Sequence, residues 1–255
     1  MNDFCKLTNK TAIITGGGRG LGQQMAIALG EAGANIVICS RNLDNCKETA
    51  DLLKEKGIPA IALSCDISKQ TDIDFVIQET LAKFGQIDIL INNSGTSWIA
   101  PVLDYPEDKW DKVMNINVKG TFLFSQAVAK KMAMQQSGKI INISSVTGYY
   151  GTHPLYLNAI AYNTSKGAII TLTKELAVKL AEHNIQVNAI APGFFPTKIT
   201  TALEKFQKPI LAKIPANRFG TSDDLKGITL FLAGHASDYV TGQTIAVDGG
   251  LSSML

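Results

Sequence analysis

The sequence predicts an α/β protein with a doubly wound parallel sheet of about seven strands and helices on both faces. Three observations support this prediction. Short apolar runs alternate with amphipathic stretches along the 255 residues. The runs are apolar at nearly every position, which is typical of strands covered on both faces. A glycine lies just past the end of each of the first three amphipathic stretches, where helices commonly end.

The expected elements follow one another in chain order. Seven apolar runs are expected strands, at residues 11–15, 35–40, 60–64, 87–93, 139–144, 185–191 and 244–248. Five amphipathic patterns are expected helices, at residues 21–31, 43–56, 71–84, 117–135 and 161–182. Repeating strand–helix units joined by right-handed crossovers build this fold class. No linker or low-complexity segment divides the chain, so residues 1–255 are predicted to form a single domain.

One segment departs from this alternation of strands and helices. Residues 192–221 contain four prolines and no expected strand, yet they carry several phenylalanines, leucines and isoleucines. Long excursions of this kind are usually functional. We therefore predict a substrate lid at about residues 192–221, with a packed subdomain as the alternative.

Composition argues against several classes of protein. The net charge is +2, and no basic run is longer than Lys130–Lys131, which argues against nucleic-acid or acidic membrane partners. No apolar run approaches the roughly 20 residues that a membrane span needs. The four cysteines form no C-x-x-C pair, and no histidine cluster completes a metal site. We expect a cytoplasmic protein with no bound metal.

A glycine-rich turn joins the first expected strand to the first expected helix. Residues 11–22 read TAIITGGGRGLG and follow the pattern T-G-x-x-x-G-x-G. In this pattern the first glycine permits a tight turn, the second lets a pyrophosphate approach the backbone, and the third allows close helix–strand contact. Free N–H groups at the helix start favour phosphate. The turn thus predicts a Rossmann-like dinucleotide site that includes Gly16, Gly18, Arg19, Gly20, Leu21 and Gly22.

Two arginines bear on which dinucleotide is bound. Arg41 follows the second strand, where NAD-binding proteins commonly carry an acidic residue for the ribose hydroxyls. Arg19 lies in the glycine turn and is expected to converge on the same point. Two guanidinium groups near the ribose 2′ position suit a phosphate, so we predict NADP(H) as the cofactor. The alternative is that one or both arginines are solvated.

Asp66 and Ile67 follow the third strand at the sheet edge where ligands bind. Asp66 is predicted to accept a hydrogen bond from the adenine amino group of the cofactor. Capping of the next helix by Asp66 is an equally good interpretation.

Tyr162 and Lys166 are four residues apart in an otherwise apolar helical pattern, so they share one helix face. An ammonium group within a few ångströms favours a phenolate, so Lys166 is predicted to lower the pKa of Tyr162. A tyrosine tuned in this way exchanges a proton with a carbonyl or hydroxyl oxygen. Ser145 follows an apolar strand and is predicted to stabilise charge on the same oxygen, whereas Ser144 is expected to satisfy backbone groups.

These motifs occur in the order of the short-chain dehydrogenase/reductase family, which the chain resembles over nearly its whole length, to VDGG at 247–250. The shared motifs are the glycine turn, NNSG (92–95), NVKG (117–120), NISS (142–145), Y-x-x-x-K (162–166) and APG (191–193). The resemblance implies a catalytic tetrad of Asn117, Ser145, Tyr162 and Lys166, in which the asparagine holds a water that links the lysine to solvent.

The same resemblance implies further contacts. Asn93 and Gly95 line the cofactor cleft, Lys166 holds the nicotinamide ribose, and Thr197 contacts the nicotinamide amide. It also implies a homotetramer. Two features depart from the family: Ser94 replaces a usual alanine, and the segment between Ser145 and Tyr162 is a few residues longer.

Within the family, residues 92–118 and 191–200 resemble β-ketoacyl reductases, above all the one associated with rhamnolipid synthesis; gluconate 5-dehydrogenase-like members are also similar. The resemblance implies an NADPH-dependent carbonyl reductase of fatty acid metabolism. It would reduce 3-oxoacyl thioesters of CoA or of acyl carrier protein to 3-hydroxyacyl products. A polyol or sugar-acid dehydrogenase is the second interpretation. A dinucleotide-binding regulator without turnover is a third, from a different functional class.

Overall fold

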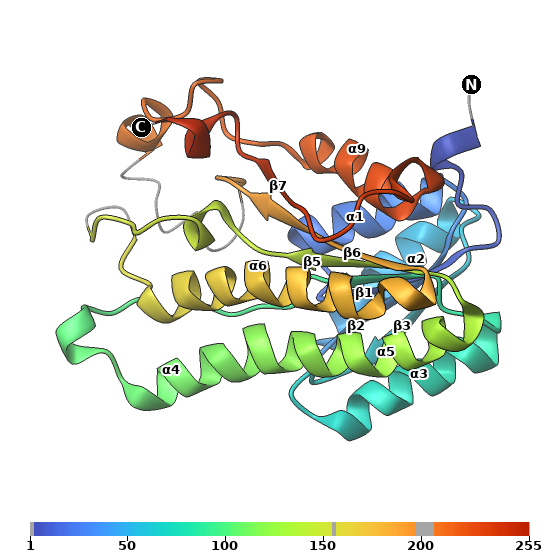
Figure 1. Cartoon of the computed structure of the whole chain (residues 1–255). Coiled ribbons are helices and arrows are strands. Elements are labelled where there is room, and N and C mark those ends of the chain that lie inside the picture. Colours follow the sequence, from blue (N-terminus) through green and yellow to red (C-terminus); the bar gives the residue numbers. More distant parts are fainter. Residues whose placement is uncertain (1–2, 155–156, 197–206, 255) are drawn as a thin grey trace.

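Seven parallel strands form one sheet with helices on both faces (Figure 1). The computed structural model describes residues 3–154, 157–196 and 207–254. The strands are β1 (Thr11–Thr15), β2 (Asn35–Ser40), β3 (Ala60–Ser64), β4 (Ile89–Asn92), β5 (Gly138–Ile143), β6 (Ile185–Pro192) and β7 (Thr244–Val247). Their order across the sheet is β3-β2-β1-β4-β5-β6-β7, and every pairing is parallel. The predicted fold class is confirmed.

Among the described residues, the α-helices include all five predicted patterns and three that the patterns missed. The predicted ones are α1 (Gly20–Glu31), α2 (Leu43–Glu55), α3 (Gln70–Phe84), α5 (Thr121–Gln135) and α6 (Ile160–Leu180). The others are α4 (Glu107–Met114), α8 (Gln207–Leu211) and α9 (Ser222–Ala233). Gly33, Gly57 and Gly85 follow α1, α2 and α3 with φ of +103°, +75° and +80°. This left-handed conformation explains why glycine ends each of these helices.

The core has two layers, one on each face of the sheet. α1, α2 and α9 cover one face, and α3, α5 and α6 cover the other. Neighbouring strand residues serve opposite layers: Ile14 packs with the first group and Ile13 with the second. Both are fully buried, so the strands are apolar at consecutive positions, as the sequence pattern indicates.

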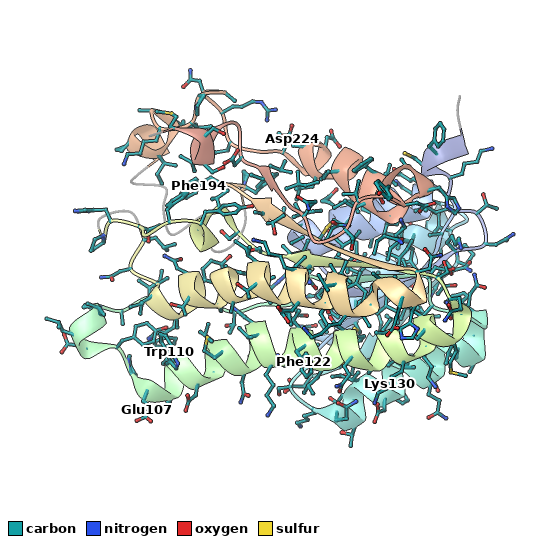
Figure 2. The ribbon with its side chains drawn as sticks, viewed as in Figure 1. Glu107, Trp110, Phe122, Lys130, Phe194 and Asp224 are labelled. Carbon is teal, nitrogen blue, oxygen red and sulfur yellow. The ribbon has the colours of Figure 1, made fainter. Side chains whose placement is uncertain are left out.

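A π-helical turn joins α4 to α5. Residues Asn115–Gly120 form this turn, so α4 and α5 continue one another as a long rod (Figure 2 labels Glu107 and Trp110 on α4, and Phe122 and Lys130 on α5). The sequence pattern predicted ordinary helix from residue 117. π-Helical turns are rare and occur mostly at functional sites, so this departure marks Asn117 as unusual.

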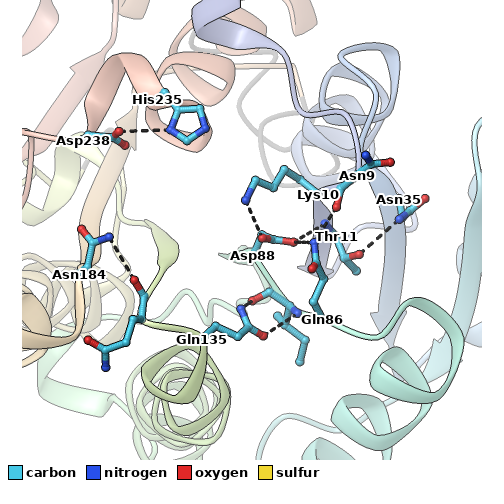
Figure 3. A network of polar contacts seen from close by, with 12 residues as sticks. Asn9, Lys10, Thr11, Asn35, Gln86, Asp88, Gln135, Asn184, His235 and Asp238 are labelled. Atoms are coloured by element: carbon cyan, nitrogen blue, oxygen red, sulfur yellow. Dashed lines mark hydrogen bonds and ion pairs between the residues drawn. The ribbon is translucent and has the colours of Figure 1, made fainter.

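Polar contacts hold the amino-terminal edge of the sheet together (Figure 3). Asp88, which is 7% exposed, accepts hydrogen bonds from Lys10 Nζ, the Thr11 backbone N–H and Gln86 Nε2. Lys139 at the start of β5 pairs with Asp238 at 2.7 Å. Because all the strands are parallel, the loops after β1, β4, β5 and β6 meet at the opposite edge, where the predicted site residues lie.

Candidate active site

The glycine turn between β1 and α1 has the backbone geometry that the motif predicts. Gly16 and Gly20 have φ of +65° and +58°, a conformation that favours glycine. A Cβ at Gly22 would lie 2.4 Å from Asn93 Nδ2 and 2.5 Å from the Gly16 carbonyl oxygen. A Cβ at Gly20 would meet no atom within 4 Å. The turn is therefore closely packed at Gly22 and open at Gly20.

Neighbouring elements brace this turn. Asn93 Nδ2 donates to the carbonyl oxygens of Thr15 at 3.0 Å and Gly16 at 3.1 Å. Thr49 of α2 donates from Oγ1 to the Gly18 carbonyl oxygen at 3.1 Å. Asn93 therefore acts on the turn itself, a contact that the prediction of a cleft-lining role did not anticipate.

The start of α1 is suited to phosphate. Arg19 is the N-cap residue and makes no side-chain cap bond, and the first turn of α1 contains no acidic residue. Backbone N–H groups at such a helix start attract anions. Arg19, Gly20 and Arg41 are all exposed. The glycine turn, with Leu21 after it packed against the core, therefore fits a dinucleotide pyrophosphate.

Asp66 does not cap α3. The N-cap of α3 is Lys69, and no side chain bonds there. Asp66 Oδ1 instead accepts from the Ser68 backbone N–H at 3.0 Å and from Ser68 Oγ at 2.7 Å. Burial raises the pKa of Asp66, but these bonds and the nearby charge of Arg41 outweigh burial and lower it overall. The capping interpretation is wrong, and the adenine contact remains a prediction. Ile67 is buried and packs against Gly120 of the π-helical turn.

Two serines, Ser144 and Ser145, follow β5 and make different hydrogen bonds. Ser144 Oγ donates to the Lys166 carbonyl oxygen at 2.8 Å, so it satisfies backbone as predicted. Ser145 is 8% exposed, and its Oγ accepts from Thr147 N at 3.2 Å and Thr147 Oγ1 at 3.0 Å. Ser145 also lies within hydrogen-bond reach of the Tyr162 phenol.

Tyr162 and Lys166 lie one turn apart on α6. Lys166 Nζ is 5.4 Å from the centroid of the Tyr162 ring and donates to the Ile143 carbonyl oxygen at 2.7 Å. Burial raises the pKa of Tyr162, and the hydrogen bond with Ser145 offsets this only in part. Burial also lowers the pKa of Lys166 to about 8. The predicted lowering of the Tyr162 pKa is therefore wrong, because burial of the phenol raises the pKa and the Ser145 hydrogen bond offsets this only in part.

Asn117 connects three elements from within the π-helical turn. It is 1% exposed, and its Nδ2 donates to the Thr96 carbonyl oxygen and to Ser165 Oγ, both at 2.9 Å. Its Oδ1 accepts from the Thr96 backbone N–H at 2.8 Å. A Cβ at Gly95 would lie 3.4 Å from Asn117 Oδ1 and 3.8 Å from Lys166 Nζ. The structure thus brings Gly95, Asn117 and Lys166 together.

Comparison with known proteins decides the family. Residues 16–252 match the family described as enoyl-(acyl carrier protein) reductase. The chain is 42% identical over 254 residues to 2-dehydro-3-deoxy-D-gluconate 5-dehydrogenase of Dickeya dadantii, covering 98% of each sequence. The chain belongs to the short-chain dehydrogenase/reductase family.

Other members of the family differ in substrate. The 3-oxoacyl-(acyl-carrier-protein) reductase of Thermotoga maritima is 38% identical over 250 residues, which span 96% of this chain and 99% of that protein. The crystal structure of gluconate 5-dehydrogenase from Burkholderia cenocepacia, in complex with NADP and tartrate, superimposes with a TM-score of 0.94 at 39% identity. That match covers 99% of each chain. This short-chain dehydrogenase/reductase is an oxidoreductase with relatives in both substrate classes.

The predictions of a nicotinamide contact, of a substrate lid and of no bound metal concern parts of the chain that the structure describes only in part. Thr197 lies outside the described residues, as do Ile199, Leu203 and Phe206 of the expected lid. Among the described residues, Phe195 and Ile210 are buried. The ring of Phe194 packs against that of Phe219, with 6.4 Å between the ring centroids. In the part of the chain that the structure describes, no cluster of side chains suits a metal ion, and no helix is long and apolar enough to cross a membrane.

Replacing Lys166 with methionine should stabilise the protein. The lysine pKa is near 10.5 in the unfolded chain and about 8 in the fold. Below pH 8 both states hold the proton, so the cost of burying the charge is fully present. Between pH 8 and 10.5 the unfolded state binds more protons, so wild-type stability rises with pH. We expect the variant to be about 2 kcal/mol more stable at pH 7, with a difference that narrows toward pH 10.

Urea denaturation at a series of pH values measures this difference. Lys139→Met is the matched control, because Lys139 is also buried but is paired with Asp238, so its replacement should destabilise the protein. If Lys166→Met is less stable than the wild type at pH 7, burial of the cation is not costly.

Proposed function

We propose that this protein interconverts a ketone and a secondary alcohol with NADP(H). One observation carries this proposal: Ser145, Tyr162, Lys166 and Asn117, from three separate segments, lie close together, and Asn117 and Lys166 adjoin Gly95, two residues after the Asn93 that bonds to the glycine turn. The bound cofactor supplies a hydride to the carbonyl carbon or accepts one from the alcohol carbon. A proton donor and a hydrogen-bond donor at the oxygen are what such a reaction needs from the protein.

Each side chain has a role in this proposal. Tyr162 holds its proton at neutral pH, since burial keeps its pKa above the already high ordinary value of a phenol, and it donates that proton to the carbonyl oxygen during reduction. Ser145 donates a hydrogen bond to the same oxygen. Lys166, with its pKa of about 8, exchanges a proton readily and binds the nicotinamide ribose hydroxyls. Asn117 holds the turn beside Lys166 in place through Thr96 and Ser165.

NADP(H) is supported by the charges around the expected adenosine site. The glycine turn holds the pyrophosphate, and Arg19 and Arg41 bind the 2′-phosphate. The related gluconate 5-dehydrogenase from Burkholderia cenocepacia was crystallised with NADP. Asp66 and Ile67 border the adenine, and Asn93, Gly95 and Thr197 border the nicotinamide half.

Arg41→Asp should reverse the cofactor preference. The substitution removes a charged hydrogen bond to the 2′-phosphate and repels that group, so we expect the KM for NADPH to rise about 10- to 100-fold. The KM for NADH should fall or stay unchanged. Steady-state rates with each cofactor measure the ratio. Lys47→Asp makes the same charge change on exposed α2 and should leave the preference unaltered. A wild type that uses both cofactors equally contradicts the two-arginine proposal.

The substrate that we favour is a keto or hydroxy sugar acid. The relatives with 42% and 37% identity are a 2-dehydro-3-deoxy-D-gluconate 5-dehydrogenase and a 5-keto-D-gluconate 5-reductase. Phe195 and Ile210 of the expected apolar lid are buried within the fold and are not available to an acyl chain. The second candidate is a 3-oxoacyl thioester, which the Thermotoga maritima relative supports.

NADPH oxidation tests both candidates. The wild type is assayed with 5-ketogluconate and with acetoacetyl-CoA, and the reverse reaction with gluconate and NADP⁺. A kcat/KM at least tenfold higher for 5-ketogluconate supports the sugar-acid proposal, and the opposite ratio supports the thioester. Tight NADPH binding without turnover on either substrate contradicts both substrate candidates and favours the dinucleotide-binding regulator over them.

We also propose a homotetramer. Phe122 and Met134 on α5 and Val178 on α6 are 39%, 81% and 79% exposed, and they offer apolar contact outside the core. Light scattering after gel filtration tests this state. A monomer at assay concentration contradicts it.

A further inference from the structure

We propose that Thr147 is a positioning residue that fixes the direction of the Ser145 hydroxyl. Thr147 lies two residues beyond Ser145, in the short 3₁₀ turn formed by Val146–Gly148. This inference rests on the proposed function, because it concerns how Ser145 meets the substrate oxygen. It adds a residue that none of the recognised motifs contains.

Two donors of Thr147 converge on one oxygen. The Thr147 backbone N–H lies 3.2 Å from Ser145 Oγ, and Thr147 Oγ1 lies 3.0 Å from it. Both residues are buried, at 9% and 8% exposed, so water does not compete freely for these positions. A backbone N–H can only donate, which makes Ser145 Oγ an acceptor in at least one of the two bonds.

The consequence follows from the valence of a hydroxyl group. A serine oxygen has two lone pairs and one hydrogen. When Thr147 occupies both lone pairs, Ser145 can only donate. Its hydrogen then points away from Thr147, toward Tyr162 and the substrate oxygen beside it. A fixed donor aimed at an oxygen that gains negative charge stabilises the transition state without rearrangement.

The Thr147 hydroxyl decides between two arrangements. If it donates, the Ser145 hydrogen is free for the substrate. If the Thr147 hydroxyl accepts, the Ser145 hydroxyl donates its hydrogen to Thr147 and cannot donate it to the substrate oxygen. Among the described residues, Ser145 Oγ is the only acceptor that the Thr147 hydroxyl contacts, which favours donation.

Thr147→Val tests the inference because it removes the hydroxyl and keeps the shape and the backbone N–H. We expect kcat for ketone reduction to fall about tenfold, with little change in the KM for substrate or NADPH. Thr147→Ser restores the hydroxyl and should recover most of kcat. With a weaker Ser145 bond, the Tyr162 pKa should rise, so the alkaline fall of reduction should move to higher pH in Thr147→Val.

A double-variant cycle separates positioning from a merely structural role. In a Ser145→Ala background, Thr147→Val should cause no further loss, because Thr147 acts only through Ser145. An equal loss in both backgrounds, or a wild-type kcat and pH profile in Thr147→Val, overturns the inference. If the valine variant does not fold, Thr147→Ala takes its place and is compared with Thr147→Ser. The same changes in kcat and pH profile then support or overturn the inference. Full activity of Ser145→Ala alone would instead overturn the proposed function.

Discussion

Replacing Tyr162 with phenylalanine is expected to lower kcat for ketone reduction about 10³-fold. The phenol is the group placed to deliver a proton to the substrate oxygen, and Ser145 cannot replace it because a serine hydroxyl is a far weaker acid than a phenol. The ring contacts remain, so NADPH affinity should stay within a factor of about three. Steady-state NADPH oxidation measures kcat, and NADPH fluorescence titration measures affinity.

Tyr149→Phe is the matched control for Tyr162→Phe. Tyr149 lies in the loop after Ser145, and its hydroxyl donates to the Thr244 carbonyl oxygen at 3.1 Å. Removing that hydroxyl should loosen the loop slightly and leave kcat within about fivefold of the wild type, since one neutral hydrogen bond is lost. If both variants lose activity equally, Tyr162 has no special role.

Gly22→Ala is expected to abolish tight NADPH binding and to destabilise the fold by about 2–4 kcal/mol. The added Cβ would lie 2.4 Å from Asn93 Nδ2 and 2.5 Å from the Gly16 carbonyl oxygen. The carbonyl oxygen belongs to the turn and Asn93 braces it, so relief of the clash must move Gly16 or break the Asn93 bonds. Thermal unfolding and NADPH titration measure the two effects.

Gly227→Ala is the matched control for this substitution. Gly227 is exposed within α9, and a Cβ there would meet no atom within 4 Å. Alanine is the better helix former, so this variant should be more stable by about 0.5–1 kcal/mol, with unchanged NADPH affinity. Wild-type stability and affinity in Gly22→Ala would show that the turn is less tightly packed than its geometry indicates.

The strands were predictable because they are covered on both faces. Ile13 and Ile14 enter different layers of the core, so consecutive apolar residues mark β1 without any alternation. α9 was missed although its start carries a readable signal: Thr221 and Asp224 form a capping box. α4 follows Pro106, is only eight residues long and has a single buried residue, Val113, so it offers too few apolar positions for a sequence pattern to be recognised.

The candidate site was predictable where a motif names a residue, and not where contacts cross the fold. Ser145, Tyr162 and Lys166 are recognised from their spacing. The hydrogen bond from Thr49 to the Gly18 carbonyl oxygen braces the glycine turn. It joins residues 31 positions apart in the chain, so no local sequence pattern reveals it. The pKa of Tyr162 was predicted in the wrong direction for a related reason: sequence spacing reveals the nearby cation, but the burial of the phenol depends on the whole fold.

The pH dependence of the two reaction directions tests the central claim most directly. Reduction needs Tyr162 protonated and oxidation needs it deprotonated, so kcat for ketone reduction should be level near neutral pH and fall as pH rises. Over the same range, kcat for alcohol oxidation should rise. Mirror-image profiles of this kind, both lost in Tyr162→Phe, are the predicted result. Reduction that accelerates with rising pH, or profiles that survive in Tyr162→Phe, would contradict proton transfer by this tyrosine.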